Sequence, residues 1–97
     1  MFIAACRFEL HLASAQSLKD KRAVVQSVIT RLHNQFHISA AEIDELDRHQ
    51  IAAIGLAVVS NQAQHARQVI ERALRSIEES RLDAELVAIE IEEIPAF

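Results

Sequence analysis

Residues 6–32, CRFELHLASAQSLKDKRAVVQSVITRL, decide the fold because they join two different hydrophobic periods through a short polar turn. Apolar and polar residues alternate strictly over Cys6–Leu12, which is the period of a strand with one buried face. Apolar residues then recur at helical spacing, which predicts an amphipathic helix over Leu18–Gln35. Ser17 stands just before this helix and Asp20 three residues later, so the two indicate an N-cap with an acidic variant of the capping box.

The remainder of the chain continues the alternation of strands and helices. Phe36–Ser39 predicts a short second strand, with Glu42–Asp47 as its acidic exit and loop. The nearly continuous apolar run Gln50–Ser60 predicts a central strand that is covered on both faces. Asn61 is the predicted N-cap of a second helix, whose apolar stripe is Ala66, Val69, Ile70, Ala73 and Ile77. Residues 84–94 predict an edge strand with one face formed by Val87, Ile89 and Ile91.

This β-α-β-β-α-β order is that of a ferredoxin-like sandwich in the α+β class. We expect a single domain over residues 1–97, with an antiparallel sheet in the order 4-1-3-2 and both helices on one face. The predicted core residues are Phe8, Leu10, Val25, Ile29, Leu32, Leu56, Val58, Val69, Ile70 and Ile77.

Composition excludes several classes of protein. The net charge of −4 argues against a protein whose surface is covered with cations for binding nucleic acid, and we expect no DNA partner. A single cysteine excludes a disulfide framework, and a single glycine excludes a P-loop or a dinucleotide fingerprint. No apolar run approaches the ~20 residues of a membrane span, and the N-terminus lacks the pattern of a signal peptide. We therefore expect a cytoplasmic location without membrane contact.

The stretches FELHLASAQSLKDKRAVVQSVITRL, FHISAAEID and IGLAVVSN resemble the bacterial YlxP-like family, whose function is unknown. The resemblance covers nearly the whole chain, and SLKDKR is its most specific part. It implies a ferredoxin-like fold, a cytoplasmic location and genes often beside those for translation initiation and ribosome maturation factors. The family tends to carry Trp, Arg and Glu where His49, Ile51 and Ala53 stand here, so this chain's open sheet face is the more apolar.

The basic cluster of SLKDKR is the first candidate site. Residues 1–35 carry five Lys or Arg against two Asp or Glu, although the whole chain is acidic. The candidate anion-binding or RNA-binding residues are Ser17, Lys19, Lys21 and Arg22. With the resemblance, they predict a non-enzymatic accessory factor that contacts ribosomal RNA, a ribosomal particle or another translation component. One alternative is a dimeric regulatory module that binds a small anionic metabolite there; another is that Asp20 and the acidic loop neutralise the cluster.

The uncovered face of the sheet is the second candidate site. Its small and apolar residues are Ala5, Ile51, Ala53, Gly55, Ala57 and Ala88. An exposed apolar patch of this kind is unusual for a monomer, so we expect a homodimer through this face. In the alternative, the chain is a monomer whose small residues lie beneath Arg7, Glu9 and Glu90.

No catalytic or metal-binding pattern is visible in the sequence. The five histidines are scattered over different elements without the spacing of metal ligands, and Cys6 falls on the core side of its strand. The open face also lacks the aromatic residues on which RRM domains stack bases. We therefore expect no enzyme activity, no cofactor and no metal.

Overall fold

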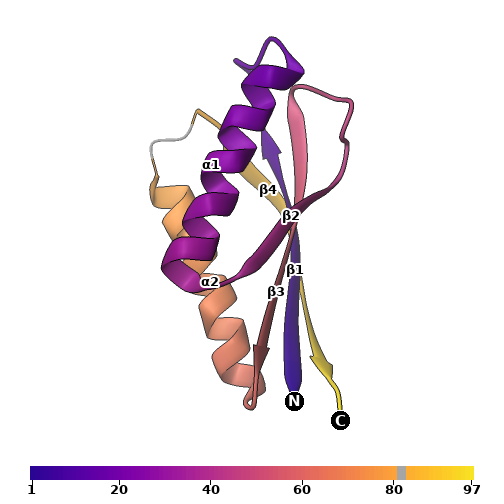
Figure 1. Ribbon diagram of the computed structural model, residues 1–97, viewed down its shortest axis with the longest axis vertical. Coiled ribbons are helices and arrows are strands. Elements are labelled where there is room, and N and C mark those ends of the chain that lie inside the picture. Colours follow the sequence, from indigo (N-terminus) through magenta and orange to yellow (C-terminus); the bar gives the residue numbers. More distant parts are fainter. Residues whose placement is uncertain (81–82) are drawn as a thin grey trace.

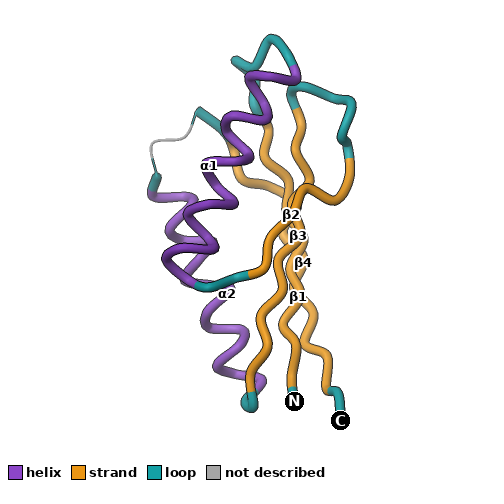
Figure 2. Tube along the Cα trace, viewed as in Figure 1, coloured by secondary structure: helices purple, strands orange, loops and turns teal. Residues whose placement is uncertain are grey.

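The sheet has four antiparallel strands in the order β2-β3-β1-β4, and both helices pack on one of its faces (Figure 1). The structure is a computed structural model that describes residues 1–80 and 83–97. Its elements are β1 (Phe2–His11), α1 (Leu18–Phe36), β2 (Ser39–Asp44), β3 (Ile51–Ser60), α2 (Ala63–Glu79) and β4 (Glu85–Pro95). Figure 2 shows the helices as one layer beside the strands, so the predicted ferredoxin-like sandwich is confirmed.

The hydrophobic core lies between the sheet and the two helices. Alternate residues of β1 enter it and are buried: Ala4, Cys6, Phe8 and Leu10. The predicted core residues form one cluster, in which Ile29, Val58 and Val69 are partly buried and the others fully buried. The alternation of β1 and the helical spacing of α1 are therefore sufficient to place the core.

The boundary between α1 and β2 differs from the prediction. α1 continues through Phe36, and His37 takes a left-handed conformation with φ 54°. The N–H of His37 donates to the carbonyl of His33, and the N–H of Ile38 donates to that of Leu32, which ends the helix. β2 therefore begins at Ser39 and includes residues that the prediction had assigned to the acidic loop.

The start of α2 also differs from the prediction. Its N-cap is Gln62, not Asn61, and Gln62 makes no side-chain capping bond. Ser60 accepts a hydrogen bond from the N–H of Gln62 through its hydroxyl group, at 3.1 Å. Ser60 therefore holds the turn between β3 and α2 that Asn61 was expected to hold.

A β-bulge at Ala88 changes the side-chain pattern of β4. The register of β4 against β1 shifts there, and Ala88 has φ 55°. As a result, Val87 lies on the open face of the sheet, whereas Ile91 lies on the face that the helices cover. The prediction that Val87, Ile89 and Ile91 share a face is wrong, because a bulge adds one residue to the alternation. The predicted edge position of this strand is confirmed.

Neither helix combines the length and the apolar character of a membrane span, within the residues that the structure describes.

Candidate functional site

The start of α1 is capped as the sequence predicts. The N–H of Asp20 donates to the Ser17 hydroxyl at 3.1 Å, and the Asp20 carboxylate accepts from the N–H of Gln16 at 2.9 Å. Asp20 thus places a negative charge at the helix start, where an external anion would bind. This arrangement stabilises the helix and competes with an anionic ligand.

Lys21 does not belong to the exposed basic cluster. Its side chain is fully buried, and its ammonium nitrogen Nζ lies 2.7 Å from Oε2 of Glu42 on β2. The same nitrogen donates to three backbone carbonyl oxygens, those of Glu45 at 2.9 Å, Ile51 at 3.3 Å and Leu46 at 3.4 Å. These three hydrogen bonds use all the donors of an ammonium group. As a correction to the predicted site, Lys21 has no donor left for a ligand, and for this residue the neutralisation alternative describes the structure.

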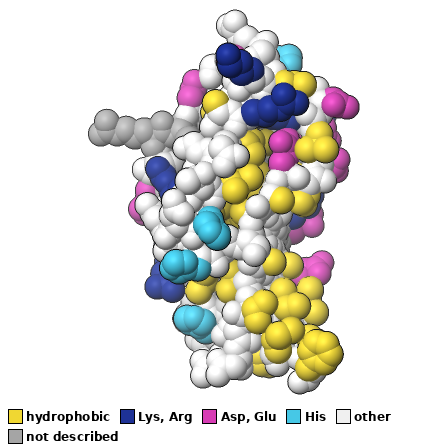
Figure 3. Space-filling view, viewed as in Figure 1, with side chains coloured by type: hydrophobic (Ala, Val, Ile, Leu, Met, Phe, Trp, Pro, Cys, Tyr) yellow, Lys and Arg dark blue, Asp and Glu magenta, His cyan; other side chains and the backbone are white. Residues whose placement is uncertain are grey.

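The remaining cations of the cluster are Lys19 and Arg22. Both are exposed on the first turns of α1. In Figure 3, Lys and Arg side chains lie at this end of the molecule and also along the helix side, whereas most of the visible acidic side chains lie on the side of the sheet. The predicted basic site is therefore reduced to two solvent-facing cations beside a capping carboxylate.

The predicted dimer face lies on the side of the sheet that the helices leave uncovered, but its residues are not equally exposed. Ala53 is fully buried, because it pairs with Glu9 on one side and Asp44 on the other. Gly55 is half-buried, and a β-carbon built on it would lie 3.0 Å from Cγ2 of Ile43. Ile51 and Ala5 are also half-buried, whereas Ala57 and Ala88 are exposed. Ala53 therefore adds no exposed apolar surface to this face, although the sequence predicted that it would.

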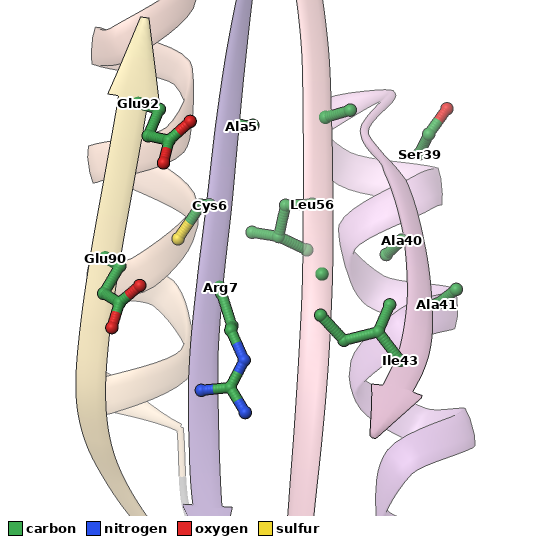
Figure 4. Close-up of a pocket in the computed structure, with 12 residues that line it drawn as sticks. Ala5, Cys6, Arg7, Ser39, Ala40, Ala41, Ile43, Leu56, Glu90 and Glu92 are labelled. Atoms are coloured by element: carbon green, nitrogen blue, oxygen red, sulfur yellow. The ribbon is translucent and has the colours of Figure 1, made fainter.

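A groove of about 510 Å³ crosses this face (Figure 4). Small residues from three strands form its floor: Ala5, Ala41, Gly55 and Ala57. Ile43 of β2 stands at one side, and Glu90 and Glu92 of β4 stand at the other, with Arg7 between them. Sequence reasoning missed the contribution of β2 because it placed this strand too early. The alternation of Ala41 and Ile43 was the available signal.

Ion pairs hold the centre of the groove. The Arg7 guanidinium lies 3.4 Å from Glu9 and 3.8 Å from Asp44. Nε2 of His11 lies 3.2 Å from Oε1 of Glu9. The hydrogen bond from His11 and then that from Arg7 lower the pKa of Glu9 below its usual value. Glu9 is therefore ionised at neutral pH and fixes Arg7 over the sheet.

An apolar row continues the floor of the groove toward the chain termini. Ile3 pairs with Val59 on β3 and with Ile94 on β4, so the three side chains lie side by side. Val59 is 63% exposed and Ile94 is 40% exposed. Figure 3 shows hydrophobic side chains gathered at this end of the molecule. The open face thus combines a groove with exposed aliphatic side chains.

The chemistry of these residues suits binding. Burial raises the pKa of the Cys6 thiol to about 11, and this thiol lies on the core side of β1 rather than in the groove. Among the described residues, no group of three or more His, Cys, Asp or Glu side chains could hold a metal ion. The groove instead offers apolar area, carboxylates and one guanidinium.

Comparison with known proteins gives the family. The family described as protein of unknown function, DUF503, matches residues 3–91. The chain belongs to the DUF503 family. It is also 36% identical over 70 residues to the uncharacterized protein YlxP of Bacillus subtilis (strain 168), which covers 72% of this chain and 76% of that protein. The predicted YlxP-like resemblance is confirmed, and the matched DUF503 region includes the helix start and all four strands except the first residue of β1 and the end of β4.

Proposed function

We propose that this DUF503 protein is a non-enzymatic accessory factor of translation or ribosome maturation, and that it binds a macromolecular partner through the open face of its sheet. The observation that carries the proposal is the groove of about 510 Å³, continued by the exposed side chains of Val59 and Ile94. The link to translation comes from the YlxP-like resemblance and its gene neighbourhood.

Physical chemistry favours this face over the basic helix start. Exposed apolar area contributes to association when a partner removes it from water, at about 25 cal/mol per Å² before the costs of binding. The groove and the apolar row are contiguous, since Ala5 and Ile3 are neighbours on the same face of β1. The helix start, in contrast, has lost Lys21 to the interior and carries the Asp20 carboxylate.

Co-sedimentation with purified ribosomal subunits tests the proposal. Ala57→Arg fills the floor of the groove and adds a positive charge, whereas Gln64→Arg makes the same charge change on the exposed surface of α2. We expect the wild type and Gln64→Arg to sediment with a subunit, and Ala57→Arg to be released. Equal sedimentation of the two variants, or none by the wild type, contradicts the proposal.

Direct RNA contact through Lys19 and Arg22 is a second candidate, favoured by the exposure of both side chains. Each phosphate neutralised contributes about 0.7–0.9 to the slope of log affinity against log salt. If RNA contact contributes, the double variant Lys19→Gln/Arg22→Gln lowers this slope by about 1.5, while Ala57→Arg leaves it unchanged or steeper. An unchanged slope in the double variant excludes this candidate.

A further inference from the structure

The open face is rich in carboxylates. The strand registers place one cation on it, Arg7, and five acidic residues, Glu9, Asp44, Glu85, Glu90 and Glu92. Arg7 is already engaged by Glu9 and Asp44. No ion pair of Glu90 or Glu92 is found in the part of the chain that the structure describes, and both side chains are exposed at the wall of the groove. The face therefore has an excess of negative charge beside an apolar floor.

The spacing of these groups matches an extended polypeptide. Glu90 and Glu92 are two residues apart on one strand, so their carboxylates repeat at about 6.6 Å along β4. Alternate side chains of an extended segment repeat at the same distance. The floor of Ala5, Gly55 and Ala57 offers room for larger apolar side chains, because its own side chains are small.

We propose that the groove binds an extended segment of a partner protein in which Lys or Arg residues alternate with large aliphatic or aromatic residues. The apolar side chains lie on the floor, and the cations meet Glu90 and Glu92. This inference rests on the proposed function only in its choice of surface, and it adds the chemistry of the partner.

A second copy of the chain fits this face less well. Face-to-face stacking would bring two carboxylate-rich surfaces together, and like charges across an interface cost free energy. Ala53, which a close sheet-to-sheet contact would use, is fully buried within the chain itself. The charge of the face thus favours a basic partner over the predicted homodimer.

A peptide-binding measurement tests the inference with a labelled peptide that alternates arginine and leucine. One comparison peptide alternates glutamate and leucine, and another alternates arginine and serine. We expect the arginine-leucine peptide to bind most tightly, since only it supplies both the charge and the apolar anchors. Equal affinity for the arginine-serine peptide means charge attraction alone and overturns the inference, as does equal affinity for the glutamate-leucine peptide.

Two charge-matched variants locate the binding. Glu90→Gln/Glu92→Gln removes two carboxylates from the groove, and Glu78→Gln/Glu79→Gln removes two exposed carboxylates from α2. The first is expected to weaken the arginine-leucine peptide about fivefold, and the second less than about twofold, since exposed ion pairs contribute up to about 1 kcal/mol. Equal weakening overturns the inference.

Sedimentation of the free protein tests whether a second copy of the chain occupies the groove. A dimer that the arginine-leucine peptide does not dissociate, and that Ala57→Arg disrupts, assigns the groove to a second copy and overturns the inference. Peptide binding without ribosomal co-sedimentation would contradict the proposed function and leave this inference standing. Co-sedimentation that Ala57→Arg abolishes, together with equal affinity for all three peptides, would support the proposed function and overturn this inference.

Discussion

The ammonium group of Lys21 lies 2.7 Å from the carboxylate of Glu42, and this contact ties the first turn of α1 to β2. The same ammonium holds the carbonyls of Glu45 and Ile51, which stand before and within the strand that follows. One side chain of the SLKDKR motif therefore fixes the connection between β2 and β3. SLKDKR, the most specific part of the resemblance to the YlxP-like family, thus has a structural role at Lys21.

Replacing Lys21 with Met should destabilise the protein by about 3–5 kcal/mol, because the change leaves the Glu42 carboxylate and three carbonyls without their partner. Urea unfolding followed by circular dichroism measures the loss. The double variant Lys21→Met/Glu42→Leu should recover most of it, since no uncompensated charge remains. A Lys21→Met variant as stable as the wild type would show that the ion pair does not hold this connection.

Leu32→Ala should lower the free energy of unfolding by about 2–5 kcal/mol, because the Leu32 side chain is fully buried in the core. The loss combines transfer of the missing carbons to water with the cavity that they leave. Thr30→Ala, on the exposed side of the same helix, is the control and should change the free energy of unfolding by less than about 0.5 kcal/mol. Similar losses for the two variants would contradict the assignment of the buried face of α1.

His37→Gly should stabilise the protein by about 0.5–1 kcal/mol. His37 ends α1 with φ 54°, a conformation that costs free energy for a residue with a β-carbon and none for glycine. The cap needs only the backbone N–H of this residue, which glycine retains. Thermal unfolding of the two proteins under the same conditions decides the point, and a lower midpoint for the glycine variant would argue against a left-handed cap at this position.

The fold and the core could be predicted from the sequence, whereas two local features of the backbone could not. The period of β1 and the helical spacing of α1 were enough to predict the sandwich and its core. The left-handed cap at His37 could not be predicted, because a non-glycine residue rarely adopts that conformation and FHIS has the composition of a strand. The bulge at Ala88 could not be predicted either, because the alternation of apolar and polar residues in β4 gives no sign of an inserted residue.

The candidate site was harder to predict than the fold. Helical spacing places Lys21 near the apolar stripe of α1, and its side chain was expected to extend past the end of the sheet toward the loop before α1. Its partner Glu42 was expected in a loop and lies on β2. Which of several charged residues pairs in the interior depends on strand register, which a single sequence leaves open. The groove escaped notice because Ala41 and Ile43 belong to that same misplaced strand.

The Cys6 thiol should be unreactive toward iodoacetamide at neutral pH in the folded protein and should react once urea unfolds the chain. Burial raises the pKa of Cys6 from 9.0 to about 11, so the thiolate is scarce. A raised pKa in the folded state stabilises the protein below the unfolded pKa, and this contribution is lost as the pH rises from 9.0 toward about 11. Rapid alkylation of the folded protein would contradict the buried position of Cys6.

Hydroxyl-radical footprinting of the protein bound to ribosomal subunits tests the central claim most directly, because it reports the exposure of single side chains. Val59 and Ile94 mark the open face, and Leu46 marks the end of the molecule where Lys21 is held. All three are exposed in the free protein, at 63%, 40% and 56%. We predict that the oxidation of Val59 and Ile94 falls strongly in the complex, while the oxidation of Leu46 stays as in the free protein. Protection of Leu46 with unchanged oxidation of Val59 and Ile94 would place the contact at the basic helix start and contradict the account.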